Sequence, residues 1–245
     1  MFYPVAAGKQ EIVKDGLVLW LDANDKTSYP GSGTTWRDLT PGDNNGTLTN
    51  GPTFDSGNGG SIVFDGTNDT VICTNNNLGD KFDLNQPHTF MFWVNTLSTA
   101  RNEGILRVEN SSGNLALQVS FNKTGFTSRS IDWIPVNTSN QAGECDMASS
   151  SFSLNKWEHI CFRHTGNTVA ANMQWYVNAE EVSYRYRYAS LHSNMRTLDG
   201  EIKIGDSEEN NRFLNGSLAN MLLYNRRLTP DEIRQNYNAT RGRFQ

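Results

Sequence analysis

The sequence is short of cysteine, of clustered positive charge and of long apolar runs. Three cysteines, Cys73, Cys145 and Cys161, lack zinc-site spacing, so we expect buried free thiols, with a bridge between Cys145 and Cys161 as the alternative. The 21 Lys and Arg against 26 Asp and Glu give a net charge of −5 and form no cluster, which argues against nucleic acid as a partner. Without a run of 18 apolar residues or a signal-peptide pattern, neither membrane insertion nor secretory export is expected.

Turn-forming and aromatic residues are abundant instead. The chain contains 29 Asn and 21 Gly, which favour tight turns over helices. Six Trp, eight Tyr and twelve Phe supply too much apolar surface for a disordered chain. This composition predicts many short strands joined by turns.

Apolar stretches of strand length recur along the whole chain. Residues 16–22 and 89–94 are the clearest, residues 61–66 and 71–74 read as a hairpin, and residues 173–182 read as one strand. Because no helical periods lie between these stretches, they predict an all-β antiparallel sandwich. No linker-like tract divides the chain, so we expect a single domain.

The end of the sequence carries a helix signal. Thr229-Pro230-Asp231-Glu232 has a capping residue, a proline at the first helical position and a glutamate at the third. Ile233 and Tyr237, four residues apart, would form the buried stripe of a short helix. We expect this helix to close one edge of the sandwich.

Several of these segments together resemble a known family. They are GLVLWLDA at residues 16–23, SYPGSGTTWRDL at 28–39, NGTLTNGPTF at 45–54, GSIVFDGTND at 60–69, and the closing run 214–238. They are similar to laminin-G-like members of the concanavalin A-like lectin/glucanase superfamily. The resemblance implies a jelly roll of two curved antiparallel sheets with a short C-terminal helix over residues 15–245, and leaves residues 1–14 as an N-terminal arm.

The resemblance also bears on function. The sequence, including its ending YNATRGRF at residues 237–244, is similar to stand-alone copies in tailed phages of aquatic bacteria. This resemblance implies a non-catalytic structural or binding protein of the virion, on the capsid or tail exterior. Its partners would then be other virion proteins, with the chain present as a homo-oligomer or in multiple copies and the arm as a docking segment. The alternative is a lectin module for host-surface glycans, and a glycoside hydrolase is least favoured.

The hydrolase reading fails on its residues. Glucanases of the superfamily carry a Glu-x-Asp-x-Glu strand, whose outer carboxylates perform the chemistry. The nearest match here, Glu144-Cys-Asp-Met-Ala148, lacks the third carboxylate. His159 and His164 lie at odd separation on a predicted strand, so they would face opposite ways and could not share a metal.

Calcium is the cofactor that the resemblance suggests, because many relatives bind it in rim loops through hard oxygen ligands. Asp22, Asp38 and Asp65 stand in acidic, amide-rich loops and are the candidate ligands. The alternative is that these side chains cap turns.

Carbohydrate recognition needs an aromatic platform beside polar groups. Tyr184, Tyr186 and Tyr188 alternate with arginines, so they would share one face of a strand, and Trp133 is the tryptophan that we expect at a surface. The alternative is that the tyrosines complete the packing of a sheet.

Overall fold

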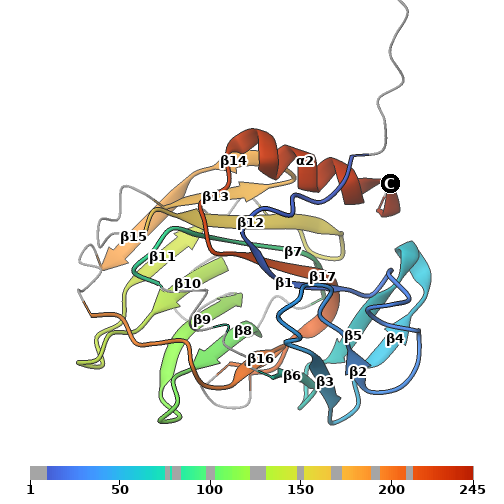
Figure 1. Cartoon of the computed structure of the whole chain (residues 1–245), viewed down its shortest axis with the longest axis horizontal. Helices are drawn as coiled ribbons and strands as arrows, with labels where there is room; N and C mark the ends of the chain where they lie inside the picture. The colour runs from blue at the N-terminus through green and yellow to red at the C-terminus, as the bar shows by residue number, and fades with distance from the viewer. Residues whose placement is uncertain are drawn as a thin grey trace, which may run out of the picture.

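The computed structural model describes residues 10–74, 78, 84–97, 103–121, 131–147, 152–166, 173–188, 194–207 and 212–244. In these residues two β-sheets lie face to face, and the helix α2 (Pro230–Thr240) lies over one of them (Figure 1). None of the helices in these ranges is long and apolar enough to cross a lipid bilayer.

The sheet nearer to α2, here sheet A, has the strand order β14-β13-β12-β7-β17-β5-β4, and β1 pairs with the second half of β17. Its strands are β1 (Leu17–Asp22), β4 (Thr53–Asp55), β5 (Ser61–Asp65), β7 (His88–Thr96), β12 (Glu158–His164), β13 (Gln174–Val177), β14 (Glu180–Val182) and β17 (Asn215–Tyr224).

The opposite sheet, sheet B, has the order β15-β11-β10-β9-β8-β16-β6-β3-β2. Its strands are β2 (Thr35–Trp36), β3 (Gly46–Thr49), β6 (Thr70–Cys73), β8 (Glu103–Glu109), β9 (Leu115–Phe121), β10 (Ile131–Pro135), β11 (Glu144–Met147), β15 (Tyr184–Tyr188) and β16 (Ile202–Ile204). Two 3-10 turns, η1 (Gly57–Gly59) and η3 (Arg241–Arg243), complete the described elements. Neighbouring strands run antiparallel in both sheets, as the sequence predicts.

Sheet A is buried on both faces. Phe90 and Phe92 of β7 face sheet B and belong to the large apolar core between the sheets. Met91 of the same strand faces the other way, into a second apolar layer beneath α2 that also contains Tyr224. A strand covered on both sides must be apolar on both sides, which explains the continuous apolar run at residues 89–94.

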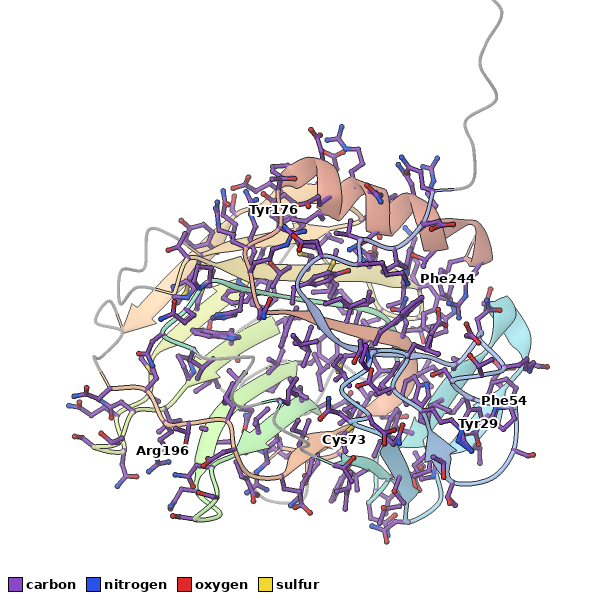
Figure 2. The ribbon with its side chains drawn as sticks, viewed as in Figure 1. Tyr29, Phe54, Cys73, Tyr176, Arg196 and Phe244 are labelled. Atoms are coloured by element: carbon purple, nitrogen blue, oxygen red, sulfur yellow. The ribbon has the colours of Figure 1, made fainter. Side chains whose placement is uncertain are left out.

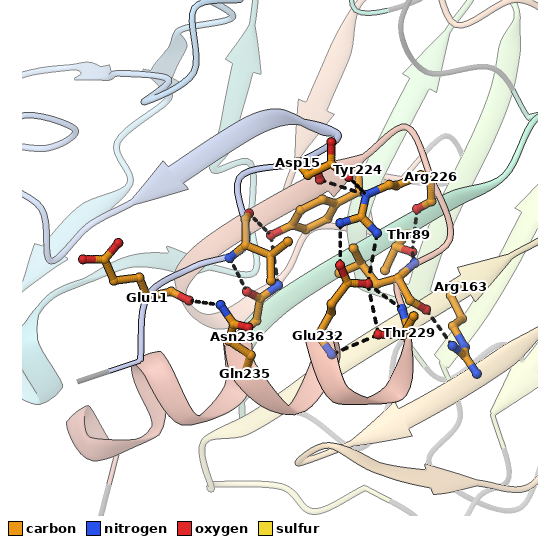
Figure 3. Close-up of polar contacts among 12 residues, drawn as sticks. Glu11, Asp15, Thr89, Arg163, Tyr224, Arg226, Thr229, Glu232, Gln235 and Asn236 are labelled. Atoms are coloured by element: carbon orange, nitrogen blue, oxygen red, sulfur yellow. Dashed lines mark hydrogen bonds and ion pairs between the residues drawn. The ribbon is translucent and has the colours of Figure 1, made fainter. Parts of the chain in front are cut away.

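The helix begins with the predicted cap. Thr229 Oγ1 accepts a hydrogen bond from Glu232 N at 3.3 Å, and Thr229 N donates to Glu232 Oε2 at 2.8 Å (Figure 3). Arg226 adds an ion pair to Glu232 at 2.7 Å, and this hydrogen-bonded guanidinium lowers the pKa of Glu232 to about 2. Ile233 is buried and Tyr237 packs beside it, so the predicted stripe is confirmed.

Three details differ from the sequence predictions. The helix covers the face of sheet A, not an edge, because Ile233 and Tyr237 pack on side chains from its central strands. Residues 61–66 and 71–74 are not a hairpin: β5 belongs to sheet A and β6 to sheet B, so the turn between them crosses the sandwich. The stretch 173–182 turns at Asn178 and Ala179, where φ is +52° and +67°, and forms β13 and β14.

All three cysteines are free and buried, as expected. Cys145 lies in the core between the sheets and Cys161 in the layer beneath α2, so a bridge between them is excluded. Burial raises the pKa of Cys145 to about 12, which keeps this thiol protonated and unreactive.

Buried histidines occupy both apolar layers. His164 contacts Trp133 in the core, whereas His159 contacts Trp93 and Tyr237 beneath the helix, which confirms that the two face opposite ways. Burial lowers the pKa of His88 to about 4 and that of His159 to about 3.

These histidines predict a loss of stability in acid. Below pH 6.5 both histidines become protonated in the unfolded chain but stay neutral in the folded protein. Each histidine therefore lowers the free energy of unfolding by about 1.4 kcal/mol for every pH unit of acidification, until the pH reaches its folded pKa. Urea unfolding between pH 7 and pH 5 should therefore give a shallower pH slope for His88→Phe and for His159→Phe than for the wild type. Parallel slopes would contradict this account.

Candidate functional site

Trp133, expected at a surface, lies in the core with 1% of its area exposed. Its ring is stacked on Phe162 of sheet A at 4.8 Å. In β10, Trp133 pairs with Val119 of β9, and strand alternation points both side chains toward the opposite sheet. The expectation was wrong because this face of β10 is covered by sheet A, a tertiary contact that the local sequence does not show.

The tyrosine row lies at the outer strand of sheet B. Tyr184 pairs with Met147 and packs against the core. For this residue the structure therefore agrees with the alternative that the tyrosines complete the packing of a sheet. Tyr186 pairs with Cys145 in the same sheet. The side chains of Tyr186 and Tyr188 lie outside the described residues, so a carbohydrate role for them stays a prediction.

Two aspartates that the sequence does not associate with each other are paired across neighbouring strands. Asp132 of β10 pairs directly with Asp146 of β11. Paired carboxylates about 5 Å apart are the machinery of retaining glycosidases. Both residues are 0% exposed, however, and a sugar cannot reach a fully buried dyad. The Glu144 side chain lies outside the described residues.

The three calcium candidates lie in separate turns. Asp38 accepts five hydrogen bonds, from the backbone of Trp20 and from the backbone and side chains of Thr40 and Asn44. Asp65 accepts from Thr67 N at 2.8 Å within its own turn. In the described ranges, no three acidic, His or Cys side chains gather as a metal site, so calcium binding stays a prediction.

Asp22, the remaining candidate, lines a cavity of about 700 Å³ at the C-terminal end of α2. We call it the helix-end cavity. Its walls come from residues before β1, from β1 itself, and from the end of α2 with η3. The lining side chains used below are Lys14, Trp20, Asp22, Asn24, Asn238 and Arg243.

An ion pair forms one side of the cavity. Arg243 Nη1 lies 2.8 Å from Asp22 Oδ1, which also accepts a hydrogen bond from Asn24 N at 2.9 Å. Burial raises the pKa of Asp22, and the charge of Arg243 opposes that rise. In the described part of the chain Asp22 Oδ2 has no hydrogen-bond donor, so this oxygen is available to a ligand.

Arg243 is fixed by the turn at η1. Its guanidinium donates to Asn58 O at 3.2 Å and to Gly60 O at 2.9 Å. The approach requires glycine at position 59, where φ is +81° and a Cβ would stand 2.6 Å from Asn24 Oδ1. Phe244 stacks on Trp93 at 4.2 Å and holds the C-terminal segment down (Figure 2).

An indole forms another side of the cavity. Trp20 is half-buried, and its buried Nε1 has no hydrogen-bond partner among the described residues. Lys14 Nζ lies 3.5 Å from the centre of this ring, and burial lowers the pKa of the lysine against the pull of Glu11 and Asp25. An aromatic face, a carboxylate oxygen and amides thus surround one space.

Residues before β1 are anchored to the helix and help to form this wall. Val13 N donates to Asn236 Oδ1 at 2.8 Å, and Tyr224 OH donates to Val13 O at 3.0 Å (Figure 3). Part of the segment predicted as an arm therefore packs on the domain. The sequence analysis missed Lys14, Trp20 and Arg243 as cavity residues because they come from opposite ends of the chain.

Residues 65–234 match the family described as the Concanavalin A-like lectin/glucanases superfamily. Curated protein sequences give no match. Among solved structures, the chain is similar to the ligand-binding domain of botulinum neurotoxin serotype D in complex with N-acetylneuraminic acid, with 16% identity, a TM-score of 0.65, and coverage of 91% of this chain and 50% of that one.

Two further structures are similar at comparable levels. The binding domain of Paraclostridial Mosquitocidal Protein 1 gives 18% identity and a TM-score of 0.65, with coverage of 91% of this chain and 52% of that one. Trypanosoma rangeli sialidase gives 17% identity and a TM-score of 0.61, with coverage of 97% of this chain and 36% of the sialidase. The chain spans about half of each binding domain and about a third of the sialidase. At these identities the likeness shows the fold alone.

The ion pair in the cavity predicts a measurable coupling. Arg243→Met leaves the buried Asp22 carboxylate without its counter-charge and should lower the free energy of unfolding by about 1.5–3 kcal/mol. The double variant with Asp22→Asn should lose less than the sum of the two single changes. Arg241→Met, an exposed neighbour, serves as the control and should change stability by less than about 0.5 kcal/mol in urea unfolding. Additive losses would show that the pair is not coupled.

Proposed function

Because the chain belongs to the concanavalin A-like lectin/glucanases superfamily, we propose that it is a non-catalytic carbohydrate-binding module whose site is the helix-end cavity. The observation that carries the proposal is the meeting of the Trp20 ring with Asp22 and two amides around a space of about 700 Å³. Small-ligand sites usually measure about 300–1,000 Å³, so one or two sugar rings fit.

The chemistry of the walls suits a sugar. A pyranose presents an apolar face, which packs on an indole, and hydroxyl groups, which both donate and accept hydrogen bonds. Asp22 Oδ2 would accept a hydrogen bond from one hydroxyl, while the side-chain amides of Asn24 and Asn238 would donate to others. Lys14 lies over the indole, so a stacking sugar would displace its ammonium, a contact worth about 0.5–1 kcal/mol at an exposed site.

The non-catalytic part of the proposal rests on burial. Asp132 and Asp146 are closed to solvent, and burial holds the Cys145 thiol protonated. Two of the three similar structures are binding domains, which supports a binding role, and the third is a sialidase.

Glycan arrays test the proposal directly. The protein should be displayed multivalently, because single carbohydrate sites are weak and gain from avidity. Trp20→Leu and Asn238→Ala should each weaken binding of any positive glycan about tenfold, which corresponds to about 1.4 kcal/mol. Asn114→Ala, in an exposed turn outside the cavity, is the matched control and should bind as the wild type does. A blank array, or binding that survives both cavity variants, would refute the assignment.

We also propose, on the resemblance of the ending at residues 237–244 to stand-alone phage copies, that this module is a part of a phage particle, present there in multiple copies. Deletion of residues 1–9 keeps Val13 and its anchoring bonds to the helix layer. Such a variant should fold normally but fail to join particles of the phage that encodes it, as measured by mass spectrometry of purified virions. Normal incorporation would rule out the N-terminal residues as the docking segment.

A further inference from the structure

Two arginines converge at the other end of α2. Arg163 lies in β12, and Arg227 lies in the connection between β17 and the helix. Both donate to the same oxygen, Oε1 of Gln174 in β13, from Arg163 Nε at 2.8 Å and from Arg227 Nη2. Arg163 is 5% exposed and Arg227 is half-buried, so the pair reaches solvent through Arg227.

No carboxylate neutralises this pair. In the ranges that the structure describes, neither guanidinium lies within 4.0 Å of an acidic oxygen. The acid of the cluster, Glu181, instead accepts hydrogen bonds from Gln174 Nε2 at 2.8 Å and from Tyr176 OH at 3.3 Å. Buried charges are costly unless they are paired.

Other arginines of the chain show the contrast. Arg107 pairs with Glu109 at 2.7 Å, Arg226 with Glu232 at 2.7 Å, and Arg243 with Asp22 at 2.8 Å. Each of these partly buried guanidinium groups therefore has a carboxylate. Among the described residues Arg163 is buried and has no carboxylate within 4.0 Å, a situation that it shares with Arg196, whose guanidinium donates to Leu115 O and Asn140 Oδ1.

Donors of the pair remain unused. Arg163 Nη1 donates to Leu228 O at 2.6 Å at the start of the helix, which leaves Nη2 without a bond to any described residue (Figure 3). Arg227 Nε is buried and has no hydrogen-bond partner among the described residues. Burial and the neighbouring charge of Arg163 lower the pKa of Arg227, and the charges of Tyr176 and Glu181 offset this only in part.

We propose that Arg163 and Arg227 form a binding site for an oxyanion group, a carboxylate, sulfate or phosphate carried by an acidic ligand. Guanidinium groups bind such oxygens through two parallel N–H bonds, and an anion between the pair would supply the counter-charge that the fold omits. The site is separate from the helix-end cavity, since it lies beside Leu228 and not beside residues 238–243.

The test uses the whole protein with sodium sulfate, sodium phosphate and sodium acetate, at ionic strength kept constant with sodium chloride. Arginine side-chain NMR should show saturable shifts of the Nε–H signals of Arg163 and Arg227. Arg227→Gln should raise the dissociation constant of the anion at least about tenfold, and Arg227→Lys should raise it by less. Arg234→Gln removes the same charge from an exposed position of α2 and should change the dissociation constant less than about twofold.

Thermal stability in buffer without sulfate, phosphate or acetate provides the second readout. Arg227→Gln removes a charge that repels Arg163, so the variant should be at least as stable as the wild type while losing the anion-dependent rise in Tm. Saturation by sulfate and phosphate alone identifies a tetrahedral group, and saturation by acetate also identifies a carboxylate. The absence of saturable shifts with all three salts, or an equal rise in Tm in Arg227→Gln, would overturn the proposal.

Discussion

Burial of sheet A on both of its faces is the constraint on which the rest of the structure depends. Sheet B covers one face, and α2 together with residues 11–14 covers the other. The middle of the central strand β7 can therefore be apolar on both faces, and only the second cover keeps side chains such as Met91 and Leu222 from water. The capping box and the Arg226–Glu232 pair, which fix where the helix starts, thus secure half of the shielding of the sheet.

Polar side chains gather at both ends of α2. At the C-terminal end, Phe244 and Arg243 carry the chain past the helix and form the helix-end cavity with Trp20 and Asp22. At the N-terminal end, the connection through Arg227 passes over Arg163 at the start of the helix. The two proposed sites thus lie beside the same element that completes the apolar packing.

The architecture could be read from the sequence because it depends on local patterns. Alternating apolar stretches, turn residues and the Thr229–Glu232 cap act over a few residues, and the structure confirms the sandwich and the helix. Pairing between distant strands is not local, which is why β5 and β6 were wrongly joined as a hairpin. Trp133 was misplaced for a related reason, since alternation gives two faces but does not say which of them meets the opposite sheet.

The helix-end cavity was beyond sequence reasoning for a stronger reason. Its side chains come from residues 10–24 and 238–243, and only the pairing of β1 with β17 and the packing of residues 11–14 on the helix bring those ends together. Asp22 was noticed as an acidic turn residue, but its neighbour Arg243 turns that carboxylate from a candidate metal ligand into half of an ion pair with one oxygen left over. The positive charge of Arg243 repels a second cation, so it makes Asp22 a poorer calcium ligand than an unpaired carboxylate would be. A neutral hydroxyl meets no such repulsion, which is why the pairing of Asp22 with Arg243 is compatible with the sugar site that we propose.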